Sequence, residues 1–169
     1  QSHNQLIAED WDKEAYNADI GRTMHHLSAT LPNLQFEQQL TTPVSPGATV
    51  NVQLNLGNQG AEALGHPELG APLVVTQSLA AGTTYIPGSA LLNQTLSGDL
   101  SLKVAYSTDN QITWLSEEPL TVADITDIRW ILEQPLAAGA NIQFGYQFLL
   151  SANYTESTMM MCWVRHFLS

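Results

Sequence analysis

The stretch that decides the fold reads PGATVNVQLNLGNQG over residues 46–60 and VTQSLAAGTTYIPGSA over residues 75–90. Apolar and polar side chains alternate strictly from Val50 to Leu56, which predicts a strand with one buried and one exposed face. Glycine-containing turns and the Pro87-Gly88 pair divide the remainder into short strands. Such a succession is typical of a small antiparallel β-sandwich.

Similar short strands are predicted on both sides of this stretch, separated by turn residues. They are expected over residues 34–42, 73–75, 83–86, 100–106, 125–132 and 142–148. After Tyr106 the chain is expected to return across a tight turn through Ile112 and Trp114. The predicted core includes Val50, Val52, Leu54, Leu56, Trp130, Phe144 and Phe148, and we also expect Trp114 to fill it.

The two ends of the chain differ from this pattern. In residues 1–32, Ile20, Met24, Leu27 and Leu31 recur at helical spacing, which predicts one helix or two short helices. We therefore divide the chain into an N-terminal extension, residues 1–32, that is helical or extended and serves as an assembly arm, and a sandwich, residues 33–169.

The C-terminal segment, residues 157–168, contains MMMCWV, which is apolar on both strand parities. A strand with one solvated face would alternate, so this segment predicts an extra strand buried on both faces. The predicted fold is an all-β, immunoglobulin-like antiparallel β-sandwich with a partly helical N-terminal extension and an extra C-terminal strand.

Charge excludes several classes of partner. The 169 residues include 5 Lys and Arg against 16 Asp and Glu, a net charge of −11. Phosphate contacts need clustered basic side chains, so we expect no nucleic-acid partner. No apolar run approaches the roughly 20 residues of a membrane span, so we expect no membrane insertion.

Several short motifs occur in a fixed order along the central region. They are Ser45-Pro46-Gly47, LGNQG at 56–60, LAAGTTYIPGSA at 79–90, Ile128-Arg129-Trp130 and PLAAG at 135–139. With these motifs, residues 33–150 resemble the immunoglobulin-like "conserved repeat domain" of bacterial and archaeal cell-surface proteins. That family usually occurs in tandem, whereas this chain has one copy. The resemblance implies a sandwich, export to the cell surface, adhesive or structural work and no catalytic residues.

Residues 107–114, STDNQITW, approximate the S-x-D-x-G-x-T-W pattern of the Asp-box hairpin in sialidase-type propellers, with Gln111 in the glycine position. A propeller would repeat the motif in each blade, and this chain has one copy. We therefore expect Asp109 to accept hydrogen bonds from backbone N–H groups of the turn.

Candidate metal ligands have poor spacing. They are His3, Asp10, Asp12, His25 and His26 near the N-terminus, and Asp99, Asp124 and Asp127 in the central region. Adjacent histidines point apart on a helix, and the aspartates lack the dense spacing of a calcium loop. Capping and solvated roles are expected, with no metal and no cofactor.

Cys162 lies in the most apolar run, where a buried thiol is inert. His166 is four residues further on, about 13 Å along a strand, which is too far for an activating base. We expect no catalytic residues and no enzymatic activity.

The leading hypothesis is a structural subunit of an extracellular filament, pilus-like fibre or surface layer. It is a homopolymer that assembles when subunits exchange a strand or arm, because an open sheet edge accepts an extended segment of another chain. The predicted interface residues are Leu6, Ile7, Trp11, Met159, Met161 and Trp163. The alternative is a carbohydrate- or cation-dependent adhesin module of a larger surface protein, which would bind surface glycans through tryptophans and acidic loops.

Overall fold

The computed structural model describes residues 5–9, 13–19, 26–31, 33–154 and 159–165. In the first three segments and the last one, the description covers the backbone and its strand pairing. Strands make up 43% of the structure and helical turns 7%, and no helix in the described segments reaches seven residues. The prediction of an all-β fold is therefore confirmed.

The strands follow one another along the chain with three single turns of 3₁₀ helix between them. The strands are β1 (Gln5–Glu9), β2 (Lys13–Asp19), β3 (His26–Leu31), β4 (Leu34–Leu40), β5 (Thr49–Asn58), β6 (Val74–Ser78), β7 (Thr83–Tyr85), β8 (Leu102–Ser107), β9 (Asp127–Leu132), β10 (Asn141–Leu150) and β11 (Met159–Arg165). The 3₁₀ turns are η1 (Pro67–Leu69), η2 (Ser89–Leu91) and η3 (Val122–Asp124).

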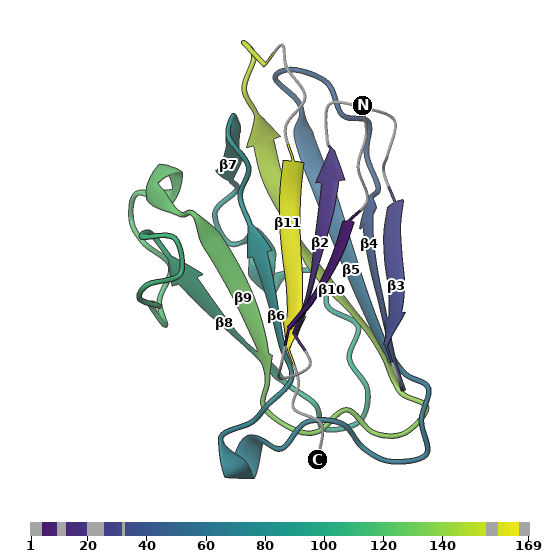
Figure 1. Cartoon of the computed structure of the whole chain (residues 1–169). Helices are drawn as coiled ribbons and strands as arrows, with labels where there is room; N and C mark the ends of the chain where they lie inside the picture. The colour runs from purple at the N-terminus through teal and green to yellow at the C-terminus, as the bar shows by residue number, and fades with distance from the viewer. Residues whose placement is uncertain (1–4, 10–12, 20–25, 32, 155–158, 166–169) are drawn as a thin grey trace.

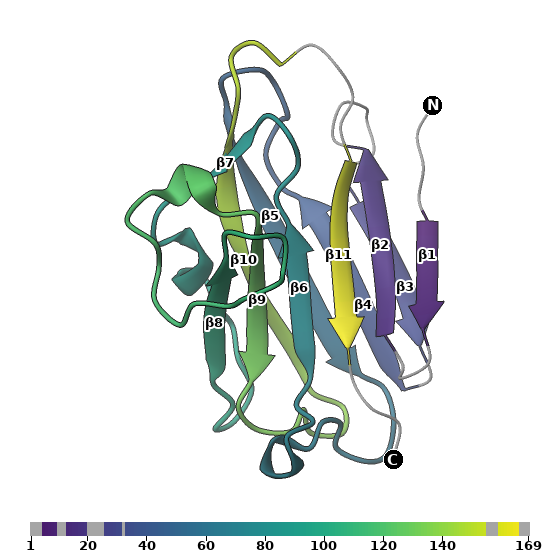
Figure 2. The same ribbon diagram turned by 60° about the vertical axis from the view of Figure 1, so that its left-hand side comes forward.

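Two antiparallel sheets form the two layers of a sandwich (Figures 1 and 2). The six-stranded sheet has the order β1-β2-β11-β6-β9-β8, and the five-stranded sheet has the order β3-β4-β5-β10-β7. The longest ladder joins β5 to β10, from Gly57 opposite Asn141 to Thr49 opposite Leu149. The extra C-terminal strand is β11, which lies inside the six-stranded sheet between β2 and β6.

The core fills the space between the sheets around Trp130 of β9. Its ring lies 5.3 Å from the ring of Phe144 and 5.9 Å from that of Tyr146, in tilted arrangements that favour aromatic attraction. The indole N–H of Trp130 donates to the carbonyl of Ala90 at 3.3 Å, so its polar atom is satisfied in the core. The predicted core residues of β5, β9 and β10 are all buried.

The helical prediction for residues 1–32 is wrong where the structure describes them, because β1, β2 and β3 are strands. Leu27 and Leu31 lie in β3 and pair with Gln38 and Leu34 of β4, while Ile20 and Met24 lie outside the described residues. The edge of β4 offers a full ladder of backbone hydrogen bonds, and such tertiary pairing overrides weak helical spacing. Asn33, with φ of 68°, suits the tight connection between Leu31 and Leu34.

The chain returns toward Tyr106 as expected, but no strand forms through Ile112 and Trp114. After Tyr106 the chain makes a single bridge, from Tyr106 to Leu115, instead of a ladder. Ile112 is 80% exposed, and Trp114 is half-buried outside the core. The residues between follow a turn that the side chain of Asp109 organises, which leaves no extended segment to pair.

Candidate functional site

The two ends of the chain meet in the six-stranded sheet, in a group that we name the terminal strand group: β1, β2 and β11 (Figure 2). Met159, Met161 and Trp163 of β11 stand opposite Asp19, Asn17 and Ala15 of β2. Leu6 and Ile7 of β1 stand opposite Tyr16 and Ala15 on the other edge of β2. Five of the six predicted interface residues thus lie in this group, and Trp11 lies outside the described residues.

The register brings the two predicted segments close together. Ile7 and Trp163 are both partners of Ala15, so they occupy one row across three strands. Neighbouring strands lie about 4.8 Å apart, which separates these two backbone positions by about 10 Å. The same row continues from Trp163 to Thr76 of β6 and then to Arg129 of β9.

Within the six-stranded sheet, the terminal strand group pairs with the remaining strands through one described ladder, that of β11 with β6. Among the described pairings, the hairpin of β1 and β2 contacts the six-stranded sheet only along β11, and β3 contacts the five-stranded sheet only along β4. Residues 20–25 connect β2 in one sheet to β3 in the other. The hairpin is therefore an edge unit whose removal would leave β11 as the new edge.

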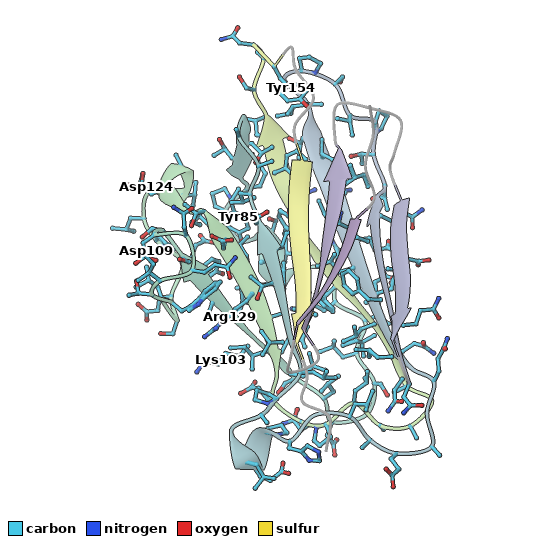
Figure 3. All side chains as sticks on the ribbon, in the orientation of Figure 1. Tyr85, Lys103, Asp109, Asp124, Arg129 and Tyr154 are labelled. Carbon is cyan, nitrogen blue, oxygen red and sulfur yellow. The ribbon has the colours of Figure 1, made fainter. Side chains whose placement is uncertain are left out.

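The Asp-box-like turn has the hydrogen bonds that its sequence predicts. One carboxylate oxygen of Asp109 accepts from the backbone N–H of Thr113 at 2.9 Å and from the Ser107 hydroxyl at 2.8 Å. The other oxygen accepts from the Thr113 hydroxyl. These hydrogen bonds, those from Thr113 above all, lower the pKa of Asp109. Asp109 lies in the loops beside β8 and β9 (Figure 3), where it organises the turn.

Gln111 occupies the glycine position of the motif with φ of 73°. Its side-chain amide donates to the carboxylate of Asp127 at 2.8 Å. Asp127 is buried at the start of β9, and this burial raises the pKa of its carboxyl group. Gln111 therefore supplies a partner for a buried acid, which glycine could not do.

Trp114 packs on the outside of the six-stranded sheet instead of filling the core, which corrects the prediction. The guanidinium carbon of Arg129 lies 4.3 Å from the centre of the Trp114 ring, within the range of a cation–π contact. The register row of Arg129 leads to Trp163 of the terminal strand group. Arg129, which Trp114 contacts, thus belongs to a row that crosses this sheet.

The candidate metal ligands are dispersed. In the described part of the chain, no group of three His, Cys, Asp or Glu side chains could hold a metal ion. Asp127 is bonded to Gln111, Asp124 ends η3, and Asp99 lies in a separate turn. Of the histidines predicted in this role, His26 lies in β3, and His3 and His25, with Asp10 and Asp12, lie outside the described residues.

Cys162 stands in β11 opposite Gln77 of β6 and Tyr16 of β2. His166, the residue weighed as its base, lies outside the described residues. The catalytic possibility at Cys162 therefore receives no support from a described neighbour that could act as a base.

Sequence reasoning missed a groove on the outer face of the five-stranded sheet. It consists of two adjoining hollows of about 330 and 470 Å³ that share Gln53 of β5 and Gln143 of β10. We name this feature the amide groove, because asparagine and glutamine are the residue types that occur most often in its lining. These residues are Gln35, Asn51, Gln53, Asn55, Asn93, Asn141, Gln143 and Gln147.

The strand register arranges these amides in rows. Gln147 stands opposite Asn51, Gln143 opposite Asn55, and Gly145 opposite Gln53 in the row between them. A Cβ atom at Gly145 would clash with the carbonyl oxygen of Val52, so this position must lack a side chain. Because Gly145 has no side chain, the surface is recessed between the row of Gln143 and the row of Gln147.

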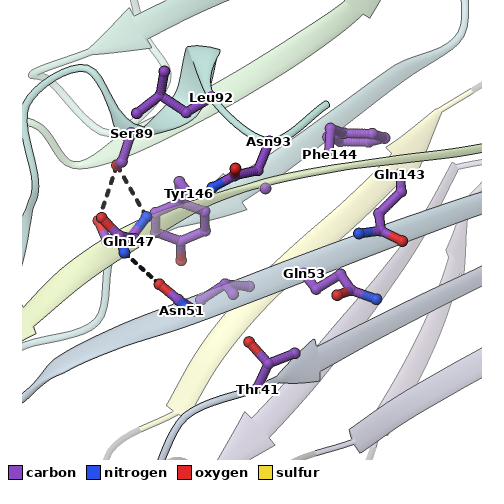
Figure 4. Close-up of a pocket in the computed structure, with 12 residues that line it drawn as sticks. Thr41, Asn51, Gln53, Ser89, Leu92, Asn93, Gln143, Phe144, Tyr146 and Gln147 are labelled. Carbon is purple, nitrogen blue, oxygen red and sulfur yellow. Dashed lines mark hydrogen bonds between the residues drawn. The ribbon is translucent and has the colours of Figure 1, made fainter. Parts of the chain in front are cut away.

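One end of the groove is fixed by hydrogen bonds (Figure 4). The side-chain amide of Gln147 donates to the side-chain oxygen of Asn51, and the backbone N–H of Gln147 donates to the Ser89 hydroxyl at 2.9 Å. Ser89 begins η2, whose loop also carries Leu92 and Asn93 to the rim. A sequence signal did exist, since the exposed positions of β5 and β10 hold amides where charged residues are usual.

The architecture defines the class of protein as an all-β antiparallel sandwich. No model of a known protein family, no curated protein and no solved structure matches the chain significantly. The resemblance to the conserved repeat domain therefore stays a prediction. Among the described residues, no helix has the length and apolar character needed to cross a membrane.

Proposed function

We propose that this protein is a structural subunit of an extracellular filament, pilus-like fibre or surface layer, and that subunits polymerise by exchanging the β1–β2 hairpin. The observation that carries the proposal is the attachment of this hairpin to the six-stranded sheet through β11 alone. The hairpin of one subunit would occupy the place beside β11 of the next, with the same register.

The exposed edge of β11 supplies the physical reason. Without β2, the seven residues of β11 would present unpaired backbone groups, and its sequence, MMMCWVR, is largely apolar. Such an edge recruits another strand, so it must be covered by the chain itself or by a neighbour. Exchange of an identical element conserves every contact and is a low-cost route to assembly.

The connection between β2 and β3 limits the geometry of exchange. Asp19 ends β2 and His26 begins β3, so residues 20–25 must span the gap between subunits. Seven extended Cα steps reach at most about 25 Å. Exchange therefore requires that β11 of the neighbour lie within about 25 Å of β3, which makes the subunits closely packed. Because each subunit gives a hairpin to the next, the contact is heterologous and can extend into a fibre.

The resemblance of residues 33–150 to a cell-surface family supports the assignment to the outside of the cell.

A second candidate, a glycan-binding module of a surface protein, draws its support from the amide groove. The two are compatible, because the groove lies on the five-stranded sheet and the exchanged hairpin belongs to the other sheet.

The proposal is tested by the assembly state of the purified full chain over a range of concentrations. Light scattering after size-exclusion chromatography should show mass that grows with concentration, and negative-stain images should show fibres or sheets. A matched variant that lacks residues 1–19, and with them β1 and β2, should remain monomeric. A full chain that stays monomeric at every concentration contradicts the proposal.

A further inference from the structure

We propose that the amide groove is a binding site for an uncharged oligosaccharide that lies along β5 and β10. The rows from Asn51 to Gly57 extend over seven residues of β5, which is about 20 Å of strand. The combined hollows fall within the volumes of sites for small ligands, about 300–1,000 Å³. This inference deepens the second candidate function, on which it rests, and is independent of the assembly mechanism.

Hydrogen-bonding chemistry favours a sugar. Each amide side chain offers two N–H donors and one carbonyl acceptor, and a sugar hydroxyl likewise both donates and accepts. Gln53 and Gln143, which both hollows share, make no side-chain hydrogen bond within the described part of the chain. Their polar groups are therefore available to a ligand at the centre of the groove.

Charge favours a neutral ligand. Glu37 is the only Asp, Glu, Lys, Arg or His among the residues that line the two hollows. Its carboxylate accepts from the amide of Asn55 at 3.1 Å at one margin of the groove. An anionic or cationic ligand would lose its hydration without a compensating row of opposite charges, whereas an uncharged polyol loses less.

The residues that line the groove include no exposed tryptophan, tyrosine or arginine side chain, which argues against a protein partner. Protein interfaces depend on buried tryptophan, tyrosine and arginine anchors. Two aromatic residues, Phe144 and Tyr146, are among the lining residues, but their side chains are 1% and 3% exposed and pack against Trp130 in the core. Among the lining residues, Leu92 of the rim is the only large exposed apolar side chain.

The experiment uses the full chain and a panel of neutral hexasaccharides of the cellulose, mannan, chitin and starch types, with hexagalacturonate as the acidic probe. Titration calorimetry is done at low and high salt. We expect at least one neutral hexasaccharide to bind with a dissociation constant that does not change with salt, because no ion pair is involved. Side-chain amide signals in nitrogen-edited NMR spectra should shift on binding.

The decisive variant combines Gln53→Ala and Gln143→Ala, and Asn153→Ala in an exposed turn is the matched control. The double variant should bind at least about tenfold more weakly, with an unchanged melting temperature, and the control should bind like the parent protein. No binding of any neutral hexasaccharide, binding that the double variant leaves intact, or binding of hexagalacturonate alone overturns the proposal.

Discussion

Gln111 illustrates how one residue serves two needs of the turn between β8 and β9. Its backbone has φ of 73°, a conformation that favours glycine, and its amide is the donor to the buried carboxylate of Asp127. The left-handed conformation costs about 1–2 kcal/mol for a residue with a Cβ atom. A hydrogen bond to a charged group contributes about 1.5–3 kcal/mol, which offsets that cost.

Gln111→Gly should therefore lower the free energy of unfolding by about 1 kcal/mol, although glycine removes the backbone strain. The loss arises because the buried carboxyl group of Asp127 loses the amide donor of Gln111. In an Asp127→Asn background the same change should cost less, and chemical denaturation of the four proteins measures this coupling. A stabilising effect of Gln111→Gly in the parent protein would show that strain outweighs the hydrogen bond.

The two aspartates of this turn should respond to neutralisation with opposite signs. The pKa of Asp109 is lowered from 3.8, so its ionised form stabilises the fold above that pH, and this contribution is lost as pH falls through the lowered value. Burial raises the pKa of Asp127 above 3.8 in the folded protein. Stability therefore falls as pH rises from 3.8 through this raised pKa, because the folded state resists ionisation of the buried carboxyl group.

At neutral pH, Asp109→Asn should lower the melting temperature and Asp127→Asn should raise it. The difference between Asp109→Asn and the parent protein should shrink well below pH 3.8, where the parent side chain takes up a proton. Exposed Asp124 in η3 provides the control, since Asp124→Asn removes the same charge. Thermal melts at the two pH values check this prediction, and equal shifts in all three variants would contradict it.

At the scale of elements, alternation predicted the strands that have one buried face. The runs around Val50 to Leu56 and Ile142 to Phe148 became β5 and β10 with the expected burial, because a period of two places alternate side chains on opposite faces. The helical spacing of Leu27 and Leu31 failed, since a strand edge was available to pair β3. The spacing of apolar residues in the sequence does not reveal that the edge of β4 is free to pair with β3.

The amide groove could not be predicted from the sequence as a site. Its residues come from β4, β5, β10 and the loop after η2, and only the register sets Gly145 between the rows of Gln143 and Gln147. The pairing of the two chain ends also depends on topology. The apolar run of β11 predicted an extra strand buried on both faces. The structure pairs β11 with β2 and β6 along its two edges, and burial of its two faces stays a prediction.

Removal of residues 1–32 should leave a folded, strand-rich monomer that no longer polymerises. The remaining strands still form two four-stranded sheets, β11-β6-β9-β8 and β4-β5-β10-β7. Circular dichroism and light scattering measure the two properties. A separate peptide of residues 1–32 should raise the melting temperature with increasing concentration, as a ligand of the folded state does, and a scrambled peptide should not.

Two outcomes would contradict the role given to the hairpin. If the truncated protein unfolds, β1 to β3 belong to the core of their own chain and are not exchangeable. If it polymerises like the full chain, the segment is an appendage and another surface drives assembly.

For the whole molecule, the net charge of −11 sets the conditions of assembly. Like-charged subunits repel over a distance that salt shortens, to about 10 Å at 0.1 M ionic strength. Polymerisation should therefore become faster as salt or a divalent cation is added. Time courses of light scattering test this, with a non-ionic osmolyte as control, and assembly that slows with salt would show that attractive ion pairs hold the subunits together.

Hairpin exchange itself is tested most directly by a disulfide across β2 and β11. Asn17 and Met161 are register partners, and directly opposed residues of antiparallel strands have Cα atoms about 4.5–5.5 Å apart, within the range of a disulfide. The variant combines Asn17→Cys and Met161→Cys with Cys162→Ser, which removes the single native cysteine. Assembled material is oxidised and run on a denaturing gel without reductant. We expect a ladder of covalent oligomers, because each disulfide joins two subunits; monomers alone, closed by an internal disulfide, would contradict exchange.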